Sequence, residues 1–137
     1  MLAGTTPVLV HNCGDLVGDA AKFPGSHVLD EHVNVTPQQA VNLAAAKGGR
    51  NSVFIDGQTA QQVVDYGLAG NQKKIQNWLR GSDQQLPLRG RFGASNSIGT
   101  VYRADGSSSP AGNGYFILLQ RAKGHSGGYY VHTAYPE

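Results

Sequence analysis

Residues 115–121, Tyr-Phe-Ile-Leu-Leu-Gln-Arg, and residues 129–135, Tyr-Tyr-Val-His-Thr-Ala-Tyr, are the stretches that decide the fold. Both are rich in aromatic and branched aliphatic side chains, which favour strands. The segment 123–128 between them contains three glycines and is typical of a turn. The sequence therefore predicts two strands that are neighbours in one antiparallel sheet.

Two more strands are predicted before this pair, at residues 86–92 and 98–103. The connection 104–113 contains an Asp-Gly pair, three serines and a proline, so we expect a flexible loop or a hairpin turn there. From Gly81 onward, the pattern indicates a meander of antiparallel strands.

The chain before Gly81 is expected to be largely helical. Thr36 is a good N-cap, with Pro37 at the first helical position and Gln39 closing a capping box. This helix should extend to about Lys47, where two glycines follow.

A short buried strand at residues 52–55 comes next, and Asp56 then caps a second helical stretch with a break at residues 67–70. Helices followed by a meander predict an α+β domain, with N-terminal helices packed on a C-terminal antiparallel sheet and Trp78 buried beneath it.

Composition limits the class of protein. A chain of 137 residues with 39% hydrophobic content can form one domain with its own core. The apolar runs are far shorter than the roughly 18–20 residues that a membrane span needs, so we expect no membrane association. The single cysteine, Cys13, excludes an internal disulfide.

Charge is distributed unevenly along the chain. Up to Gly70 there are three basic and six acidic residues, a net charge of −3, whereas from Asn71 onward eight basic and three acidic residues give +5. A basic half is suited to a polyanion such as RNA, because neutralising phosphates releases counterions.

The first twelve residues carry no Lys, Arg, Asp or Glu. They end in Pro7-Val8-Leu9-Val10-His11-Asn12, which resembles the pretoxin boundary of bacterial polymorphic toxins, and His-Asn-Cys resembles the junction cut by intein-like Hint domains. An asparagine amide can attack its own carbonyl carbon and break the chain, assisted by the preceding histidine. We therefore expect residues 1–12 to be a junction remnant and 13–137 to be the functional domain.

Histidines are the best candidates for chemistry. His27 and His32 lie five residues apart, and His132 lies in the last predicted strand. Strict alternation there would place Tyr129, Val131, Thr133 and Tyr135 on one face. His132 would then point away from the Thr133 and Tyr135 hydroxyls unless the strand is bulged.

A metal site is not expected. Ligand pairs on a helix usually lie four residues apart, whereas His27 and His32 are five apart, and no third ligand is evident. The sequence also predicts no cofactor, since it lacks a P-loop and a dinucleotide-binding glycine motif.

A series of short motifs carries a family resemblance. They are His27-x4-His32-Val33, Ser52-Val53-Phe54-Ile55-Asp56 with Ala60, Ile75-x2-Trp78-Leu79 and Thr133-Ala134-Tyr135-Pro136. Together they resemble the bacterial RNase A-like toxin domain family of contact-dependent growth inhibition proteins and related polymorphic toxins. The resemblance implies an RNase A-like fold and a metal-independent ribonuclease, neutralised in the producing cell by a cognate immunity protein.

The family's site roles transfer to His32, Thr133 and Tyr135, and His27 or His132 is left as a second catalytic histidine. One position departs from the family, which carries an arginine on the helix after the His-Val motif, whereas residues 40–44 here read Ala-Val-Asn-Leu-Ala. Cations that could replace it in binding the substrate phosphate are Arg50, Arg121 and Lys123.

RNA carries its own nucleophile, the ribose 2′-hydroxyl, so the enzyme must accept its proton, stabilise the phosphorane and protonate the leaving 5′-oxygen. His32, with an ordinary pKa near 6.5, would suit either proton-transfer role near neutrality and would add little to the core. We expect cleavage, preferably of tRNA, to a 2′,3′-cyclic phosphate.

We expect a monomer that is delivered as part of a larger secreted or cell-surface protein and acts in the cytoplasm of the target cell. Two alternatives remain open. One is a non-catalytic module that binds RNA or protein. The other is a toxin of different chemistry such as ADP-ribosyl transfer, which needs a catalytic glutamate on a late strand, where the sequence offers only the terminal Glu137.

Overall fold

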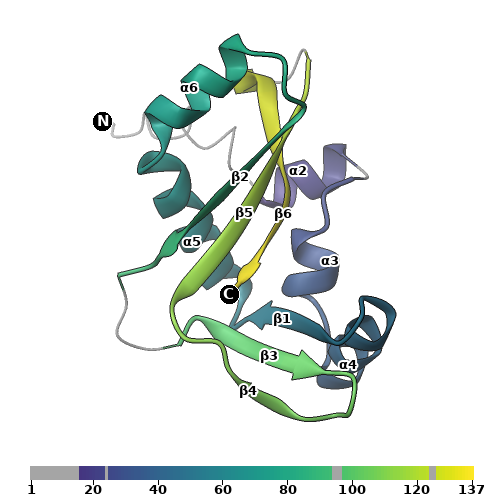
Figure 1. Cartoon of the computed structure of the whole chain (residues 1–137). Helices are drawn as coiled ribbons and strands as arrows, with labels where there is room; N and C mark the ends of the chain where they lie inside the picture. Colours follow the sequence, from purple (N-terminus) through teal and green to yellow (C-terminus); the bar gives the residue numbers. More distant parts are fainter. Residues whose placement is uncertain (1–15, 24, 94–96, 124–125) are drawn as a thin grey trace, which may run out of the picture.

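The computed structural model describes residues 16–23, 25–93, 97–123 and 126–137. The expectations about residues 1–12 and Cys13 lie outside the described residues. The elements follow in the order α2 (Leu16–Lys22), α3 (Val28–His32), α4 (Pro37–Ala46), β1 (Arg50–Phe54), α5 (Gly57–Ala69), α6 (Gln72–Arg80), β2 (Gln85–Arg91), β3 (Gly99–Arg103), β4 (Ser108–Pro110), β5 (Gly114–Arg121), η2 (Ser126–Gly128) and β6 (Tyr129–Pro136). Apart from β1, the α-helices precede the strands, and all the pairings are antiparallel, so the α+β class is confirmed (Figure 1).

The two predicted helix starts are confirmed by their hydrogen bonds. At α4, the Thr36 hydroxyl accepts the Gln39 N–H at 3.1 Å, and the Gln39 side chain accepts the Thr36 N–H at 2.9 Å. At α5, the Asp56 carboxylate accepts the Thr59 N–H at 2.7 Å. Each cap satisfies N–H groups that a helix end leaves unpaired, which is why the chain turns into helix at these residues.

The strands form two three-stranded sheets, with the orders β1-β3-β4 and β2-β5-β6. The predicted pairing of residues 115–121 with 129–135 is confirmed as β5 and β6. The single meander is wrong, because β1 pairs with β3. Of the two expectations for residues 104–113, the hairpin turn is confirmed, because this segment connects β3 to its antiparallel partner β4. A tight turn makes this hairpin possible: Gly106 has φ +91°, and Asp105 accepts the Ser107 N–H at 2.8 Å.

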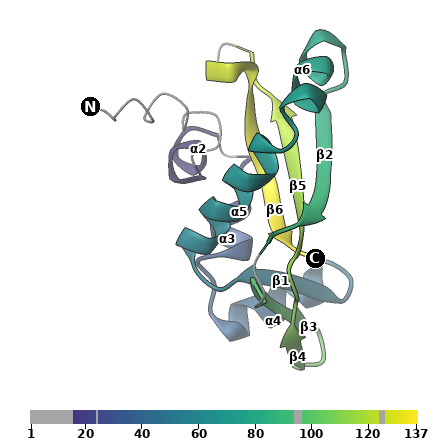
Figure 2. The same cartoon turned by 90° about the vertical axis from the view of Figure 1, so that its left-hand side faces the viewer.

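The main core lies between α5 and the inner face of the β2-β5-β6 sheet (Figure 2). Its fully buried side chains include Val63, Val64, Ile117, Leu119 and Val131. Trp78 is buried as predicted, and its Nε1 donates to the Asp83 carbonyl at 2.9 Å.

The opposite face of the sheet points away from α5 and carries the exposed β2 side chains Gln85, Pro87, Arg89 and Arg91. None of the helices among the described residues is long and apolar enough to cross a membrane.

A bulge in β6 changes which side chains share a face. Leu118 is paired with Thr133, but Leu119 is paired with Val131, so His132 has no opposite residue on β5. The expected face shared by residues 129, 131, 133 and 135 is therefore wrong. Tyr129 and Val131 are buried in the core, whereas Thr133 and Tyr135 lie on the other face and remain partly exposed.

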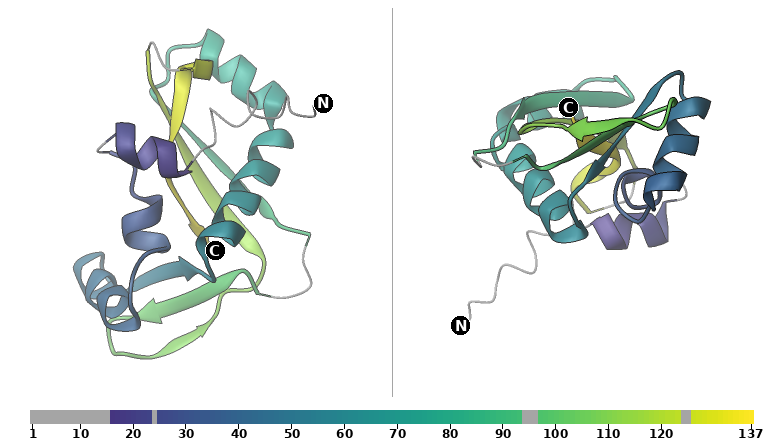
Figure 3. Two further views of the ribbon diagram at one scale, coloured as in Figure 1. Left: turned by 180° about the vertical axis from the view of Figure 1, so that it is seen from behind. Right: turned by 90° about the horizontal axis from the view of Figure 1, so that it is seen from below.

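The segment before α3 covers the free edge of β6. Ser26 Oγ donates to the Val131 carbonyl at 2.9 Å, and the His27 N–H donates to the His132 carbonyl at 2.8 Å. Val28, which follows at once, is fully buried. Seen from behind, α2 and α3 lie along β6 (Figure 3). This contact protects a sheet edge and places the end of α3, with His32, beside the last strand.

Gly99 lies where the two sheets meet. It is paired with Phe54 of β1, and a Cβ atom on it would overlap the Val53 carbonyl and the ring of Pro136 at the end of β6. The absence of a side chain therefore lets β1, β3 and β6 approach closely.

We predict that Gly99→Ala destabilises the fold by about 2–3 kcal/mol, because the methyl group must displace backbone as well as a proline ring. Urea unfolding followed by tryptophan fluorescence would measure the change. Gly93→Ala is the matched control, since a Cβ there meets no atom within 4 Å. Equal stability of the two variants would show that the sheets tolerate a wider separation.

Candidate active site

His32 is a buried histidine at the end of α3, with 4% of its surface exposed. Its Nδ1 lies 2.6 Å from the Ser52 carbonyl oxygen of β1. A carbonyl oxygen can only accept, so in neutral His32 the proton is on Nδ1 and Nε2 carries the free lone pair. The carbonyl therefore fixes both the tautomer and the orientation of the ring.

Burial lowers the pKa of His32 to about 4, although the hydrogen bond to Ser52 opposes this shift. His32 is therefore neutral near pH 7 and suited to accept a proton rather than donate one. The expectation of an ordinary pKa is wrong, because the ring is enclosed by protein. That His32 adds little to the core stays a prediction.

Tyr135 of β6 lies beside His32, with 5.2 Å between the ring centroids. Both line a pocket of about 460 Å³, whose walls are His32, Lys47, Arg50, Asn51, Ser52, Tyr135 and Glu137. Burial raises the pKa of Tyr135, and the nearby Glu137 charge adds to the effect. Tyr135 therefore keeps its proton near neutrality and can donate a hydrogen bond into the pocket.

Lys47 is the pocket residue that sequence reasoning missed. Its Nζ donates to the Glu31 carboxylate at 2.5 Å and to Asn51 Oδ1 at 2.8 Å, and Asn51 in turn donates to the Glu31 carbonyl at 2.9 Å. Burial alone would raise the pKa of Glu31, but the hydrogen bond and charge of Lys47 lower it. The sequence did contain a signal for Lys47. This cation lies one turn after Leu43, at the end of α4, the helix on which the family resemblance led us to look for an arginine.

Of the three cations predicted to bind phosphate, the structure brings only Arg50 to this pocket. Arg121 lies at the other end of the β5–β6 pair, where it is paired with Tyr129. Its guanidinium donates to carbonyl groups around the end of α6, including Trp78 at 2.8 Å and Leu79 at 3.1 Å. Lys123 follows Arg121 at the same end. Arg121 therefore caps a helix, and neither residue lies beside His32.

Thr133 lies on the same face of β6 as Tyr135, two residues earlier, but it does not line the pocket. His27 and His132 form a separate pair, with 5.4 Å between their ring centroids. The Nδ1 atoms of both rings are buried without a hydrogen-bond partner. Burial lowers the pKa of His132, and His27 adds to the effect. The structure thus separates this pair from the pocket of His32 and Tyr135.

One group of side chains has ligand atoms close enough for a metal ion among the described residues, and it consists of His27, Asp30 and Glu31, within 4.8 Å of one another. His27 Nδ1 lies 3.7 Å from the Asp30 carboxylate and 3.5 Å from that of Glu31. These are i,i+3 and i,i+4 contacts on the first turn of a helix, and Glu31 is already bound to Lys47.

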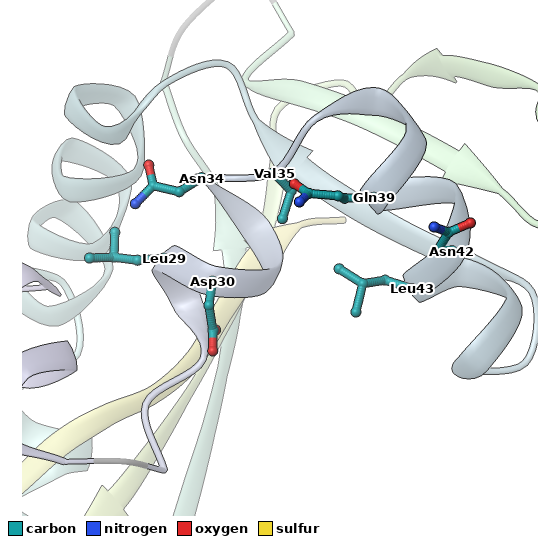
Figure 4. A pocket seen from close by; sticks show the side chains of 7 residues that line it. All are labelled: Leu29, Asp30, Asn34, Val35, Gln39, Asn42 and Leu43. Atoms are coloured by element: carbon teal, nitrogen blue, oxygen red, sulfur yellow. The ribbon is translucent and has the colours of Figure 1, made fainter.

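A second pocket, of about 510 Å³, lies between α3 and α4 (Figure 4). It is lined by Leu29, Asp30, Asn34, Val35, Gln39, Asn42 and Leu43. These side chains are mostly apolar or neutral amides and include no cation and no histidine. Although it is slightly larger, this pocket lacks the groups that phosphate chemistry needs, so the His32 pocket is the candidate active site.

Comparison with known proteins identifies a family and a similar solved structure. Residues 26–136 match the family described as the bacterial CdiA-CT RNAse A domain. The fold is similar to the crystal structure of a CdiA-CT/CdiI complex from Y. kristensenii 33638, with a TM-score of 0.70 and 25% sequence identity, covering 82% of this chain and 99% of that chain. No curated protein matches the chain.

The depressed pKa of His32 predicts a pH-dependent stability. As the pH falls below 6.5, the unfolded chain takes up a proton on this histidine while the folded chain does not, so the folded state loses stability. At pH 5.0 the loss from this group is about 2 kcal/mol relative to pH 7.5.

Urea unfolding of wild type and His32→Gln at both pH values would measure this difference. We expect the variant to lack that part of the pH dependence. The same slope in both proteins would contradict a neutral, buried His32.

Proposed function

Because the chain belongs to the family of bacterial CdiA-CT RNase A domains, we propose that it is a metal-independent endoribonuclease toxin that cleaves tRNA in competing bacteria. The observation that carries the proposal is the His32 ring, whose Nδ1 is held by the Ser52 carbonyl in a pocket that also presents Lys47, Arg50 and Tyr135. That arrangement supplies a base, positive charge and a proton donor at one place.

The reaction needs no group beyond these side chains and the substrate. His32 Nε2 accepts the proton of the ribose 2′-hydroxyl as the 2′-oxygen bonds to phosphorus. The bond from phosphorus to the 5′-oxygen breaks, and Tyr135 donates a proton to that oxygen. The products are a 2′,3′-cyclic phosphate and a free 5′-hydroxyl.

Lys47 and Arg50 would stabilise the negative charge that develops on the phosphorane oxygens. Lys47 is positioned for this task by Glu31 and by the buried Asn51, whose exposed fraction is 2%. A fixed cation is more effective than a mobile one, because no free energy is spent on orienting it during the reaction. Lys47 thus takes the place of the arginine that this chain lacks on α4.

Thr133 is proposed to hydrogen-bond the substrate from the same strand face as Tyr135. Tyr135 is preferred over His27 and His132 as the acid because it lines the pocket, whereas the histidine pair does not. The acid role was expected with a lowered pKa, whereas burial raises the pKa of Tyr135. The phenol is still a stronger acid than the 5′-hydroxyl that the transfer forms, so the proton moves to the leaving oxygen. The proposed mechanism uses no metal ion and no cofactor.

The biological setting is proposed from the relatives. The structural relative is a complex of CdiA-CT with CdiI. We expect this chain likewise to bind a cognate immunity protein, and to be delivered by a larger protein into the cytoplasm of the target cell. Residues 13–137 would then be the toxin domain, monomeric when free, and residues 1–12 the junction remnant.

We predict that the purified chain cleaves total tRNA in EDTA and leaves 2′,3′-cyclic phosphate ends, because no step requires a metal. His32→Gln should reduce the rate on the order of 10²–10⁴-fold through loss of the base. Lys47→Ala should reduce it on the order of 10²-fold through loss of charge stabilisation. Gel analysis of the tRNA and end-group analysis of the products would measure both effects.

Lys73→Ala is the matched control, since Lys73 is exposed on α6. Loss of cleavage in EDTA that a divalent ion restores would overturn the metal-independent mechanism. Full activity of His32→Gln would move the base to His27 or His132. RNA binding by wild type without cleavage would favour the alternative of a binding module.

A further inference from the structure

The outer face of the β2-β5-β6 sheet carries a continuous row of side chains that starts at the active site. From His32 and Tyr135 the row continues to Phe116 of β5, with 5.0 Å between the Tyr135 and Phe116 ring centroids. Arg89 of β2 then lies over the Phe116 ring, 4.5 Å from its centroid. The row therefore leads from the candidate base, across three strands, to a guanidinium.

A third pocket, distinct from the His32 pocket and from the pocket between α3 and α4, opens at the end of this row. Its volume is about 480 Å³, and its walls are Arg89, Gly90, Arg91, Ala111, Gly112, Asn113, Gly114 and Glu137. It shares Glu137 with the His32 pocket, so the two pockets adjoin. Three of the wall residues are glycines, so much of the wall is backbone, and Arg89 and Arg91 are its two cationic side chains.

The two arginines are arranged for an anion. Arg89 and Arg91 lie two residues apart on β2, so both side chains lie on the outer face of the sheet, and both are exposed. Arg91 Nη1 donates to Asn113 Oδ1 at 3.0 Å, which orients its guanidinium at the pocket. Arg89 forms an ion pair with the Glu137 carboxylate. An anionic group of this same chain thus already occupies the place where Arg89 binds negative charge.

We propose that this pocket, which we call the Arg89–Arg91 subsite, binds a phosphate of the RNA next to the scissile one. The Glu137 carboxylate stands where that phosphate would bind and leaves Arg89 when RNA enters. Guanidinium groups bind phosphate and carboxylate oxygens with the same donor geometry, so the exchange keeps the Arg89 hydrogen bonds satisfied.

The subsite rests on the proposed ribonuclease function. Substrates of different length test the subsite and the function separately. A dinucleoside monophosphate has one phosphate, which the His32 pocket takes. A tetranucleotide has additional phosphates that can reach the Arg89–Arg91 subsite.

Arg89→Gln/Arg91→Gln should raise KM for the tetranucleotide about tenfold with little change in kcat, and lower the salt dependence of that KM by a slope of about one per lost phosphate contact. The dinucleoside monophosphate, whose single phosphate lies in the His32 pocket, should keep its wild-type KM. Glu137→Gln should lower KM for the tetranucleotide, because the competing carboxylate is gone. Arg80→Gln, an exposed guanidinium on α6, is the control and should match wild type.

Failure of wild type to cleave either substrate would contradict the proposed function itself. The subsite alone would be overturned if wild type cleaves both substrates and the double arginine variant leaves the KM of both substrates unchanged. The same holds if the variant raises the two KM values equally. An unchanged or raised tetranucleotide KM in Glu137→Gln would show that its carboxylate does not stand in for a phosphate.

Discussion

The hydrogen bond from His32 Nδ1 to the Ser52 carbonyl joins the end of a short helix to the first strand and sets the tautomer of the candidate base. It leaves Nε2 free, while burial keeps the ring neutral at pH 7. A surface histidine would have neither property. The bond depends on the rest of the fold, because α3, β1 and β6 come from distant parts of the chain and contact one another at this point.

That meeting point is produced by close backbone contacts. The Ser26 and His27 hydrogen bonds fix α3 along the edge of β6. Gly99 lets β3 and β1 approach the end of the same strand. The bulge at His132 then turns Thr133 and Tyr135 away from the core, so that Tyr135 faces His32. Without the bulge, strict alternation would bury the Tyr135 side that now lines the pocket.

Local patterns in the sequence predicted what depends on neighbouring residues. The cap at Thr36, the cap at Asp56 and the pairing of β5 with β6 could all be predicted, because each rests on short-range chemistry. The split into two sheets could not, since the pairing of β1 with β3 joins residues about fifty positions apart. The same limit hid Lys47: its charge is visible in the sequence, but its contacts with Glu31 and Asn51 exist only in the folded chain.

The central claim is that a neutral, buried His32 is the base, and the pH dependence of kcat/KM tests it most directly, because its acid limb reports the pKa of the free enzyme's base. With a minimal dinucleoside monophosphate as substrate, we predict a rate that stays level from pH 7 down to about 5 and falls with a midpoint near pH 4. An acid limb centred near pH 6.5, the ordinary pKa of histidine, would contradict the account.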